Sequence, residues 1–386
     1  MNKKRRIISV VIIICSVAAL TAGFFLARNT APKENNPYYT ISYELAKVTK
    51  VIRNDYTFDE DSEHAVRGSQ SLSVTIITGC HKGEVMPVMN YLGPMHEKLA
   101  GEGTTLTVMI TEDSREAGYQ ISVINYNYVW LYMGLMALFV AAVAFVGRKR
   151  GIMSLVGLVY SLLAIVFFLV PMWLKGYSAV ALTLITSVFI TAFCFTLLGG
   201  FSRKTAAAMV GTLACVLVST GLAALAGSIA KVSGMTMSEA EWLLDESRTI
   251  ENVTLNVRGL FVSGIIISSL GAVMDVAMSI ASAVNELSEV DPSLSRGKLF
   301  RSGMNIGRDM IGTMTNTLIL AFVGSSLNLI IIMFAAGMQP YQLLNNDDTV
   351  MEVIRGVAGS VGLVLAVPLT AFTAAALKNS ETKKRP

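Results

Sequence analysis

Charged side chains are scarce in this sequence. Asp, Glu, Lys and Arg make up 15% of its 386 residues, whereas hydrophobic residues make up 53%. A soluble domain could not bury that much apolar surface. The composition therefore excludes an ordinary soluble globular protein and favours a membrane protein.

Cysteine and histidine are also few. Of the four cysteines, only Cys80 lies outside the long apolar runs, so no intrachain disulfide can form outside a membrane. The three histidines lie between residues 64 and 96, near the acidic run 59–63, at spacings that match no metal-ligand pattern. We therefore favour a solvated loop over a metal site and expect no cofactor. A nucleotide-binding loop is missing as well, which excludes a pump that hydrolyses ATP itself.

The sequence contains many long apolar runs. Eight of them approach the length of about 20 residues that a helix needs to cross a hydrocarbon core of about 30 Å. They cover residues 7–27, 128–146, 152–174, 177–200, 206–230, 260–284, 310–335 and 356–377. The pattern predicts a mainly α-helical, polytopic membrane bundle of about eight spans.

Lysine and arginine collect at alternate ends of these runs. With the N-terminus in the cytoplasm, every predicted cytoplasmic segment is basic, and two of the outer connections are rich in acidic residues. The positive-inside rule then predicts that both termini are cytoplasmic, and the basic clusters suit an anionic lipid bilayer as their partner. The net charge of +4 therefore requires no nucleic acid.

The chain divides into four predicted parts. Residues 1–27 form an uncleaved signal anchor and first span; a cleaved signal peptide, which would leave seven spans, is the alternative. Residues 28–127 form an extracytoplasmic domain that is all β, either a small barrel, OB-like in kind, or a sandwich. Residues 128–377 form a seven-span helical membrane domain, and residues 378–386 form a basic cytoplasmic tail. The β-rich runs of the second part are 39–52, 71–78, 84–91, 104–110 and 119–126.

Polar residues interrupt two of the apolar runs. In the run 260–284 and just beyond it they recur every three or four residues, and so form one stripe along a helix: Ser268, Gly271, Asp275, Ser279, Ser282 and Glu286. In the run 310–335 and just before it, Asp309, Thr313 and Asn316 recur in the same way, flanked by Thr317. A carboxylate inside a span costs about 2.5 kcal/mol or more, which marks Asp275 as a functional candidate. Hydrogen bonding between helices is the structural alternative for it.

The two runs are predicted to be antiparallel neighbours. At 1.5 Å per residue, Asp275 lies about 15 Å from the inner end of its span and Asn316 roughly 10 Å inside the next, so the two stripes could meet. The predicted substrate- or ion-binding site comprises Asp275, Ser279, Ser282, Thr313, Asn316 and Thr317. Closer to the water boundary, interfacial or gating roles are expected for Glu286, Arg308 and Asp309.

Other segments receive structural interpretations. The linker after Pro292 is predicted to form a short interfacial helix, and Gly303 and Gly307 to let the chain turn into the next span. In the four spans between residues 128 and 230, the Ser, Thr, Gly and Cys residues are interpreted as packing surface.

Three segments carry a family resemblance. GAVMDVAMSIASAVNEL at 271–287, RSGMNIGRDMIGTMTNTLILAFVG at 301–324 and RGVAGSVGLVLAVPLTA at 355–371 resemble the YibE/F family of bacterial multipass membrane proteins. The stretch SRKTAAAMVGT and the region ending in ISVINYNY are similar to the longer, YibE-like members. The resemblance implies a multipass protein of the bacterial plasma membrane, and it implies no substrate or mechanism.

Three functions of different classes compete. We favour a transporter or permease, not an enzyme, that uses the polar site and could be coupled to a cation or proton. A non-catalytic scaffold or sensor, binding a partner through the β domain, is the alternative. An intramembrane hydrolase with Asp275 and Asp309 as an acid pair is weaker, because the two lie about 10 Å or more apart along the helix axes. The protein partner could be a second copy in a homo-oligomer or a paralogous family member.

Overall fold

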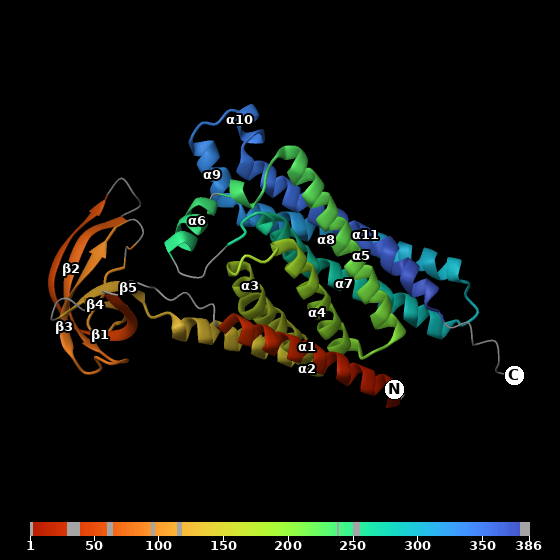
Figure 1. Ribbon diagram of the computed structural model, residues 1–386, viewed down its shortest axis with the longest axis horizontal. Coiled ribbons are helices and arrows are strands. Elements are labelled where there is room, and N and C mark those ends of the chain that lie inside the picture. The colour runs from red at the N-terminus through yellow and green to blue at the C-terminus, as the bar shows by residue number, and fades with distance from the viewer. Residues whose placement is uncertain are drawn as a thin grey trace. The chain divides into compact units, whose positions relative to one another are not determined.

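The computed structural model describes residues 3–28, 39–59, 65–93, 96, 98–113, 118–237, 239–249 and 255–378. They form two compact units, one made of residues 34–142 and the other of residues 1–33 and 143–386. Helix predominates, and a small β domain lies near the N-terminus, as predicted (Figure 1). The segment that follows residue 28, His64 and the basic tail after Lys378 lie outside the described residues.

A closed five-stranded barrel occupies most of the unit 34–142. β1 pairs antiparallel with both β2 and β4, and β3 meets β5 in a parallel pairing of Met89 with Ser122. The order β1-β2-β3-β5-β4 shows a barrel and not a sandwich. The strand number matches that of OB-folds, which are five-stranded Greek-key barrels, although those are partly open and this barrel is closed. The strands are β1 (Tyr39–Asp59), β2 (Ala65–Ile76), β3 (Val85–Leu92), β4 (Thr105–Asp113) and β5 (Tyr119–Tyr126).

Alternating apolar residues fill the barrel interior. Leu106, Val108 and Ile110 of β4 are buried, while the residues between them are partly exposed. Successive side chains of a strand point to opposite faces, so this period of two creates one apolar face. Leu72 and Val74 of β2 join the same buried cluster.

The other unit is a helical bundle. In the part of the chain that the structure describes, five helices are long and apolar enough to cross a membrane. The pair α8 and α9, bent by 53°, makes a sixth if it is one span. The helices are α1 (Lys3–Arg28), α2 (Val129–Ala164), which begins in the barrel's unit, α3 (Val170–Leu174), α4 (Ala179–Gly199), α5 (Arg203–Ala230), α6 (Ala240–Thr249), α7 (Leu260–Val290), α8 (Arg296–Ser325), α9 (Leu327–Ala335), α10 (Pro340–Leu344) and α11 (Asp347–Ala376). A π-helical turn, η1 (Ile165–Leu169), connects α2 to α3, and a 3₁₀ turn, η2 (Gly234–Thr236), precedes α6.

A backbone break divides α2. Arg148 has φ 48° and ψ −134°, values that no helix contains, although helix continues on both sides of it. The helical stretch Val129–Leu174 has 46 residues, and a straight helix of that length would measure about 69 Å, more than twice a hydrocarbon core. The break lies between the runs 128–146 and 152–174 and separates a first arm, 129–147, from a second arm, 149–164.

The linker between α7 and α8 differs from its prediction. Helix α8 runs without interruption from Arg296 to Ser325, so no separate interfacial helix forms, and Gly303 and Gly307 are not turning points. Both glycines are buried. A Cβ at Gly303 would lie 2.8 Å from Val284 and 2.9 Å from Ala371, and a Cβ at Gly307 would overlap Val367. The expectation of free rotation was wrong because these glycines serve close packing of α8 on α7 and α11.

Helix α11 packs against α5, α7 and α8, which run alongside it (Figure 1). Small residues bring α5 and α11 into backbone proximity. A Cβ at Gly211 would overlap Thr370, and a Cβ at Gly362 would overlap the side chain of Ser219. Glycine thus permits the close approach that small residues provide in membrane bundles.

Candidate functional site

The polar stripe of α7 lies on the less buried side of the helix. Twelve of its 31 residues are buried, and none of the six stripe residues is among them. Asp275, Ser279 and Glu286 are exposed in the single chain. Apolar residues cover the opposite side because Val273, Ile280 and their neighbours pack against α11 and α8. The helical spacing in the sequence therefore identified one real face of α7.

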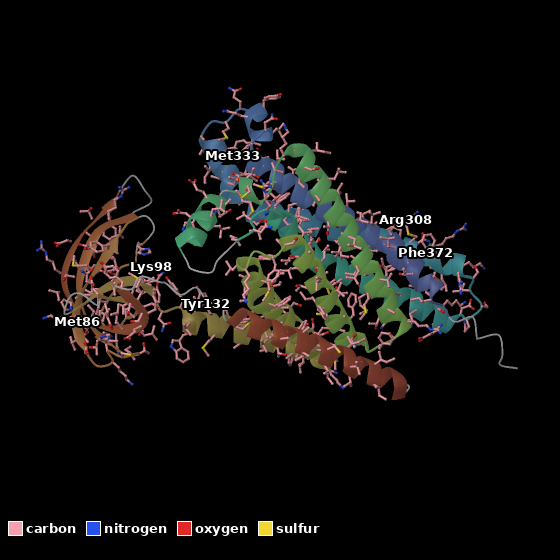
Figure 2. All side chains as sticks on the ribbon, in the orientation of Figure 1. Met86, Lys98, Tyr132, Arg308, Met333 and Phe372 are labelled. Carbon is pink, nitrogen blue, oxygen red and sulfur yellow. The ribbon has the colours of Figure 1, made fainter. Side chains whose placement is uncertain are left out.

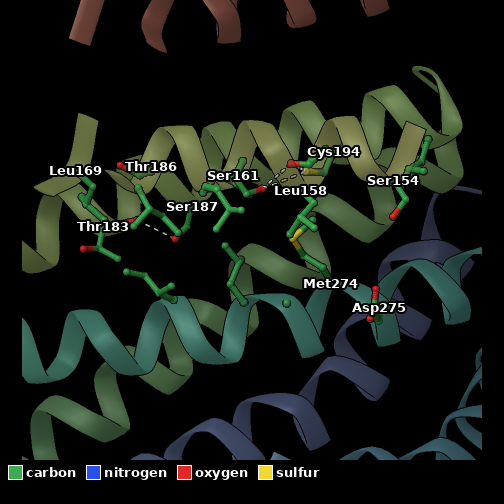
Figure 3. Close-up of a pocket in the computed structure, with 18 of the residues that line it drawn as sticks. Ser154, Leu158, Ser161, Leu169, Thr183, Thr186, Ser187, Cys194, Met274 and Asp275 are labelled. Carbon is green, nitrogen blue, oxygen red and sulfur yellow. Dashed lines mark hydrogen bonds between the residues drawn. The ribbon is translucent and has the colours of Figure 1, made fainter. Parts of the chain in front are cut away.

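A cavity of about 360 Å³ adjoins part of this stripe. Asp275 and Gly271 line it from α7, the second arm of α2 and η1 form another wall, and α4 forms a third. Figure 3 shows Asp275 and Ser154 toward one end of the cavity and Leu169 and Thr183 toward the other. Its polar lining side chains are Ser154, Ser161, Thr183, Thr186, Ser187, Cys194 and Asp275.

Most lining hydroxyl groups donate within their own helix. Ser161, Thr183, Thr186 and Ser187 each donate to the carbonyl oxygen four residues earlier, over 2.9, 2.7, 2.8 and 2.8 Å. Such a hydroxyl has used its hydrogen and keeps its lone pairs. The walls formed by α2 and α4 therefore offer hydrogen-bond acceptors to the cavity.

Asp275 gives the cavity a negative charge. It is the one carboxylate among the lining residues, and no Lys, Arg or His lines the cavity within the described ranges. No hydrogen bond or ion pair joins it to another described residue. Because a carboxylate ion also only accepts hydrogen bonds, the polar lining is complementary to a cation or to a solute rich in donors.

The cavity is elongated along the helices. Its lining extends from Met153 to Leu169 on α2 and η1, a rise of about 24 Å at helical spacing. That length approaches the ~30 Å thickness of a hydrocarbon core. The π-helical turn η1 forms part of this wall and lies just before Pro171, whose missing N–H disturbs the helical ladder. π-Helical turns are frequent at functional sites.

The remaining predicted site residues lie elsewhere. Ser279, Ser282 and Glu286 follow Asp275 along α7 but do not line the cavity. On α8, Asn316 is exposed and Thr313 and Thr317 donate to carbonyl oxygens of their own helix, at 3.1 and 2.9 Å. Among the residues that the structure describes, no hydrogen bond joins Asp275 to Asn316 or to Asp309. Arg308 donates to Asn305 at 3.4 Å.

Sequence reasoning missed the hydroxyl residues of α2 and α4 as cavity lining. They were interpreted as packing surface, yet Ser154 and Ser161 are seven residues apart, and Thr183, Ser187 and Cys194 recur at steps of four and seven. Each set therefore lies along one helix face. This spacing could have indicated a polar helix face. Hydroxyl groups inside a span are a weaker indication of a site than a carboxylate there, because they cost less to bury.

A second polar cluster lies in the barrel. Glu44 is 5% exposed and accepts from the backbone N–H of Cys80 at 3.1 Å. The Nδ1 atom of His81 lies 3.8 Å from Glu44, and its Nε2 atom lies 3.4 Å from Glu112. Tyr119 packs on the imidazole, with ring centroids 4.3 Å apart. Within the described residues no three His, Cys, Asp or Glu side chains are placed to hold a metal ion.

Most of the chain matches a known protein family. A family model described as YibE/F-like protein matches residues 135–380, which include every helix that lines the cavity and exclude the barrel. No curated protein and no solved structure matches the chain.

Proposed function

The chain belongs to the YibE/F family, and on that premise we propose that this membrane protein is a transporter or permease whose polar site is the cavity beside Asp275. The observation that carries the proposal is the position of a carboxylate in an elongated cavity lined by hydrogen-bond acceptors. An ionisable residue at such depth is costly and generally has a function. The established family and the apolar helices support the membrane setting.

The proposed topology has eight spans with both termini in the cytoplasm of a bacterial cell. α1, the two arms of α2, α4, α5, α7, the α8–α9 pair and α11 supply the spans. The barrel then lies outside the cytoplasm. Support comes from the break at Arg148, which lies within the basic triplet Arg148, Lys149 and Arg150, as expected of a cytoplasmic turn. In the proposed topology the Asp275 end of the cavity faces the cytoplasm, since Ser154 at that end lies four residues beyond the triplet.

The proposed substrate is a small cation. Asp275 supplies the charge, and the hydroxyl oxygens of Ser161, Thr183 and Ser187 replace part of the water shell along the wall. Such oxygens suit both a metal cation and a protonated amine. An anion in the cavity would be repelled by the carboxylate of Asp275 and by the lone pairs of the hydroxyl oxygens. No basic lining residue would offset that repulsion. The bend between α8 and α9 adds support, because interrupted helices are common in transporters.

Cation flux into liposomes tests the proposal. Purified protein is reconstituted, and uptake of Na⁺, K⁺ and protons is followed under an imposed gradient. We expect flux of at least one of these ions above that of empty liposomes, and a loss of about tenfold or more in Asp275→Asn, because charge-assisted contacts are the strong ones. Asp347→Asn, which removes an exposed carboxylate at the start of α11, is the matched control and should retain its flux. Full flux in Asp275→Asn, or none in the wild type, would contradict the proposal.

A sensor or scaffold role for the barrel is the second candidate. The buried Glu44 beside His81 favours it, since Glu44 Oε2 and His81 Nδ1 are buried without a hydrogen-bond partner and could serve a ligand. Deleting residues 30–125 discriminates between the two functions. Flux that persists in the deletion variant supports a transporter with an accessory barrel, whereas a barrel that retains a partner in isolation supports the sensor.

A further inference from the structure

Helix α8 leaves one long face uncovered. Only Leu299, Gly303, Gly307 and Leu318 of its 30 residues are buried. On the other side, residues at steps of three and four are exposed: Asp309, Gly312, Thr313, Asn316, Thr317 and Leu320. We call these six residues the α8 stripe. Nothing lies within 4 Å of a Cβ built on Gly312, so that part of the face is open.

Lipid tails cannot satisfy the hydrogen-bonding groups on this face of α8. Asn316 lies seven residues beyond Asp309, about 10 Å further along the helix, and so within the hydrocarbon region if Asp309 marks its edge. Its side-chain amide has two donors and two acceptor lone pairs, and it makes no hydrogen bond to another described residue. Lipid tails offer no hydrogen bonds, and an unsatisfied polar group there costs several kcal/mol in general. Another protein surface would supply the missing partners.

The stripe is complementary to itself. A twofold axis along the membrane normal places equal residues of two copies at equal depth. An amide both donates and accepts, so Asn316 can pair with Asn316 of the partner subunit, as single Asn residues do in paired helices. Arg308 and Asp309 are both exposed, and the side chain of Arg308 points away from the bundle (Figure 2). In such a dimer the two residues would give each copy a basic and an acidic group at equal depth, which suits ion pairing between copies. Thr313 and Thr317, both exposed, have small-xxx-small spacing, which lets two helices approach closely.

We propose that the α8 stripe is the interface of a homodimer, with a second copy of this chain as its occupant. Apolar surface beside the stripe adds area, since Ile319 and Val323 are exposed on the same helix. The proposal does not depend on transport, and its readout is the oligomeric state. A paralogous chain at the same place is an outcome that the experiment separates.

Cross-linking tests the interface in native membranes. In a chain whose four cysteines are replaced by serine or alanine, Leu320→Cys places a thiol at a 68% exposed position of the α8 stripe and leaves the Asn316 amide intact. This variant is oxidised with copper phenanthroline, and differently tagged copies are coexpressed. We expect a disulfide-linked dimer that contains both tags. Leu217→Cys, on a 58% exposed position of α5, is the control and should remain monomeric. A monomer for Leu320→Cys, or a cross-link to a different protein, would overturn the proposal.

A second pair of variants uses the native cysteines and so avoids any loss of folding in the replaced chain. Asn316→Leu keeps the size and removes the hydrogen bonds, whereas Asn316→Gln keeps an amide. In detergent, we expect the dissociation constant of the dimer to rise about threefold to thirtyfold for Asn316→Leu, the range that interhelical hydrogen bonds contribute in membranes. Asn316→Gln should retain part of the affinity. Equal dissociation constants for wild type and Asn316→Leu would argue against the pairing.

Discussion

α7 and α8 are consecutive helices of 31 and 30 residues, and both carry polar residues at helical spacing. Their surroundings differ. Twelve residues of α7 are buried against its neighbours, and Asp275 lines a cavity between α7, α4 and α2. Only four residues of α8 are buried, and its polar residues face outward. Polar spacing alone therefore identifies a helix face, whereas the neighbouring helices decide whether that face lines a cavity within the chain, as at Asp275, or is left uncovered, as at Asn316.

Among the changes that test this difference between α7 and α8, the largest loss of stability is expected at the packed face of α8. Gly307→Ala should destabilise the protein by about 1–3 kcal/mol, because the added methyl group overlaps Val367 and overpacking has this cost. Gly324→Ala, on the same helix with nothing within 4 Å, is the matched change. It should be neutral or stabilising by up to about 1 kcal/mol, since alanine favours helix over glycine. Thermal unfolding in detergent measures both, and equal shifts would contradict the packing described for α8.

A smaller effect, on cation flux, is expected from changes in the cavity wall that α4 forms opposite α7. Ser187→Ala removes an acceptor from the wall on α4 and should lower cation flux about twofold to tenfold, the usual range for one neutral hydrogen bond. Ser263→Ala, on α7, removes a hydroxyl that is fully buried and does not line the cavity. Its flux per folded protein should stay at the wild-type level. If both variants lose flux equally in the liposome assay, the wall on α4 is not part of the path.

The smallest effect concerns the turn that joins the two helices. Asp291 accepts from the hydroxyl and backbone N–H of Ser293, at 2.5 and 2.9 Å, and these bonds, helped by Lys378 and Lys298, hold the pKa of its carboxyl below 3.8. A lowered pKa stabilises the fold above the unfolded value and loses that contribution as the pH falls through the folded value.

Asp291→Asn should therefore lower the melting temperature slightly at pH 7, and the difference from wild type should vanish in acid below the folded pKa of Asp291. Ser293→Ala should raise the pKa of Asp291 toward its ordinary value, as measured by NMR titration. An Asp291 carboxyl that titrates at or above 3.8 in the wild type would refute this account.

Local pattern predicted much of the fold. Alternation in runs such as 104–110 is sufficient to specify a strand with one buried side, and Leu106, Val108 and Ile110 are buried accordingly. The membrane helices follow from apolar length, and the basic triplet at Arg148 marked the break inside α2. The stripe through Asp275 was predictable because residues three and four apart share a helix face.

The rotation of helices about their axes was not predictable in the same way. Asp275 and Asn316 were paired because their helices are neighbours in sequence and the two residues have similar depth. The sequence gives the position of a residue along its helix axis. The direction in which its side chain points depends on how the helix packs against its neighbours. Gly303 and Gly307 dock one side of α8 on α7 and α11, which turns Asn316 outward. The same two glycines could not be distinguished from hinges without knowing that Val284, Val367 and Ala371 lie against them.

The contact between α5 and α11 also limits how the molecule can move. Where Gly211 meets Thr370 and Gly362 meets Ser219, sliding one helix along the other would drive side chains into backbone. These two helices should therefore travel as one rigid body in any conformational cycle. If the proposed transport requires the cavity to change shape, that change would have to come from walls that α5 and α11 do not form, such as the second arm of α2 with the π-helical turn before Pro171, or α4.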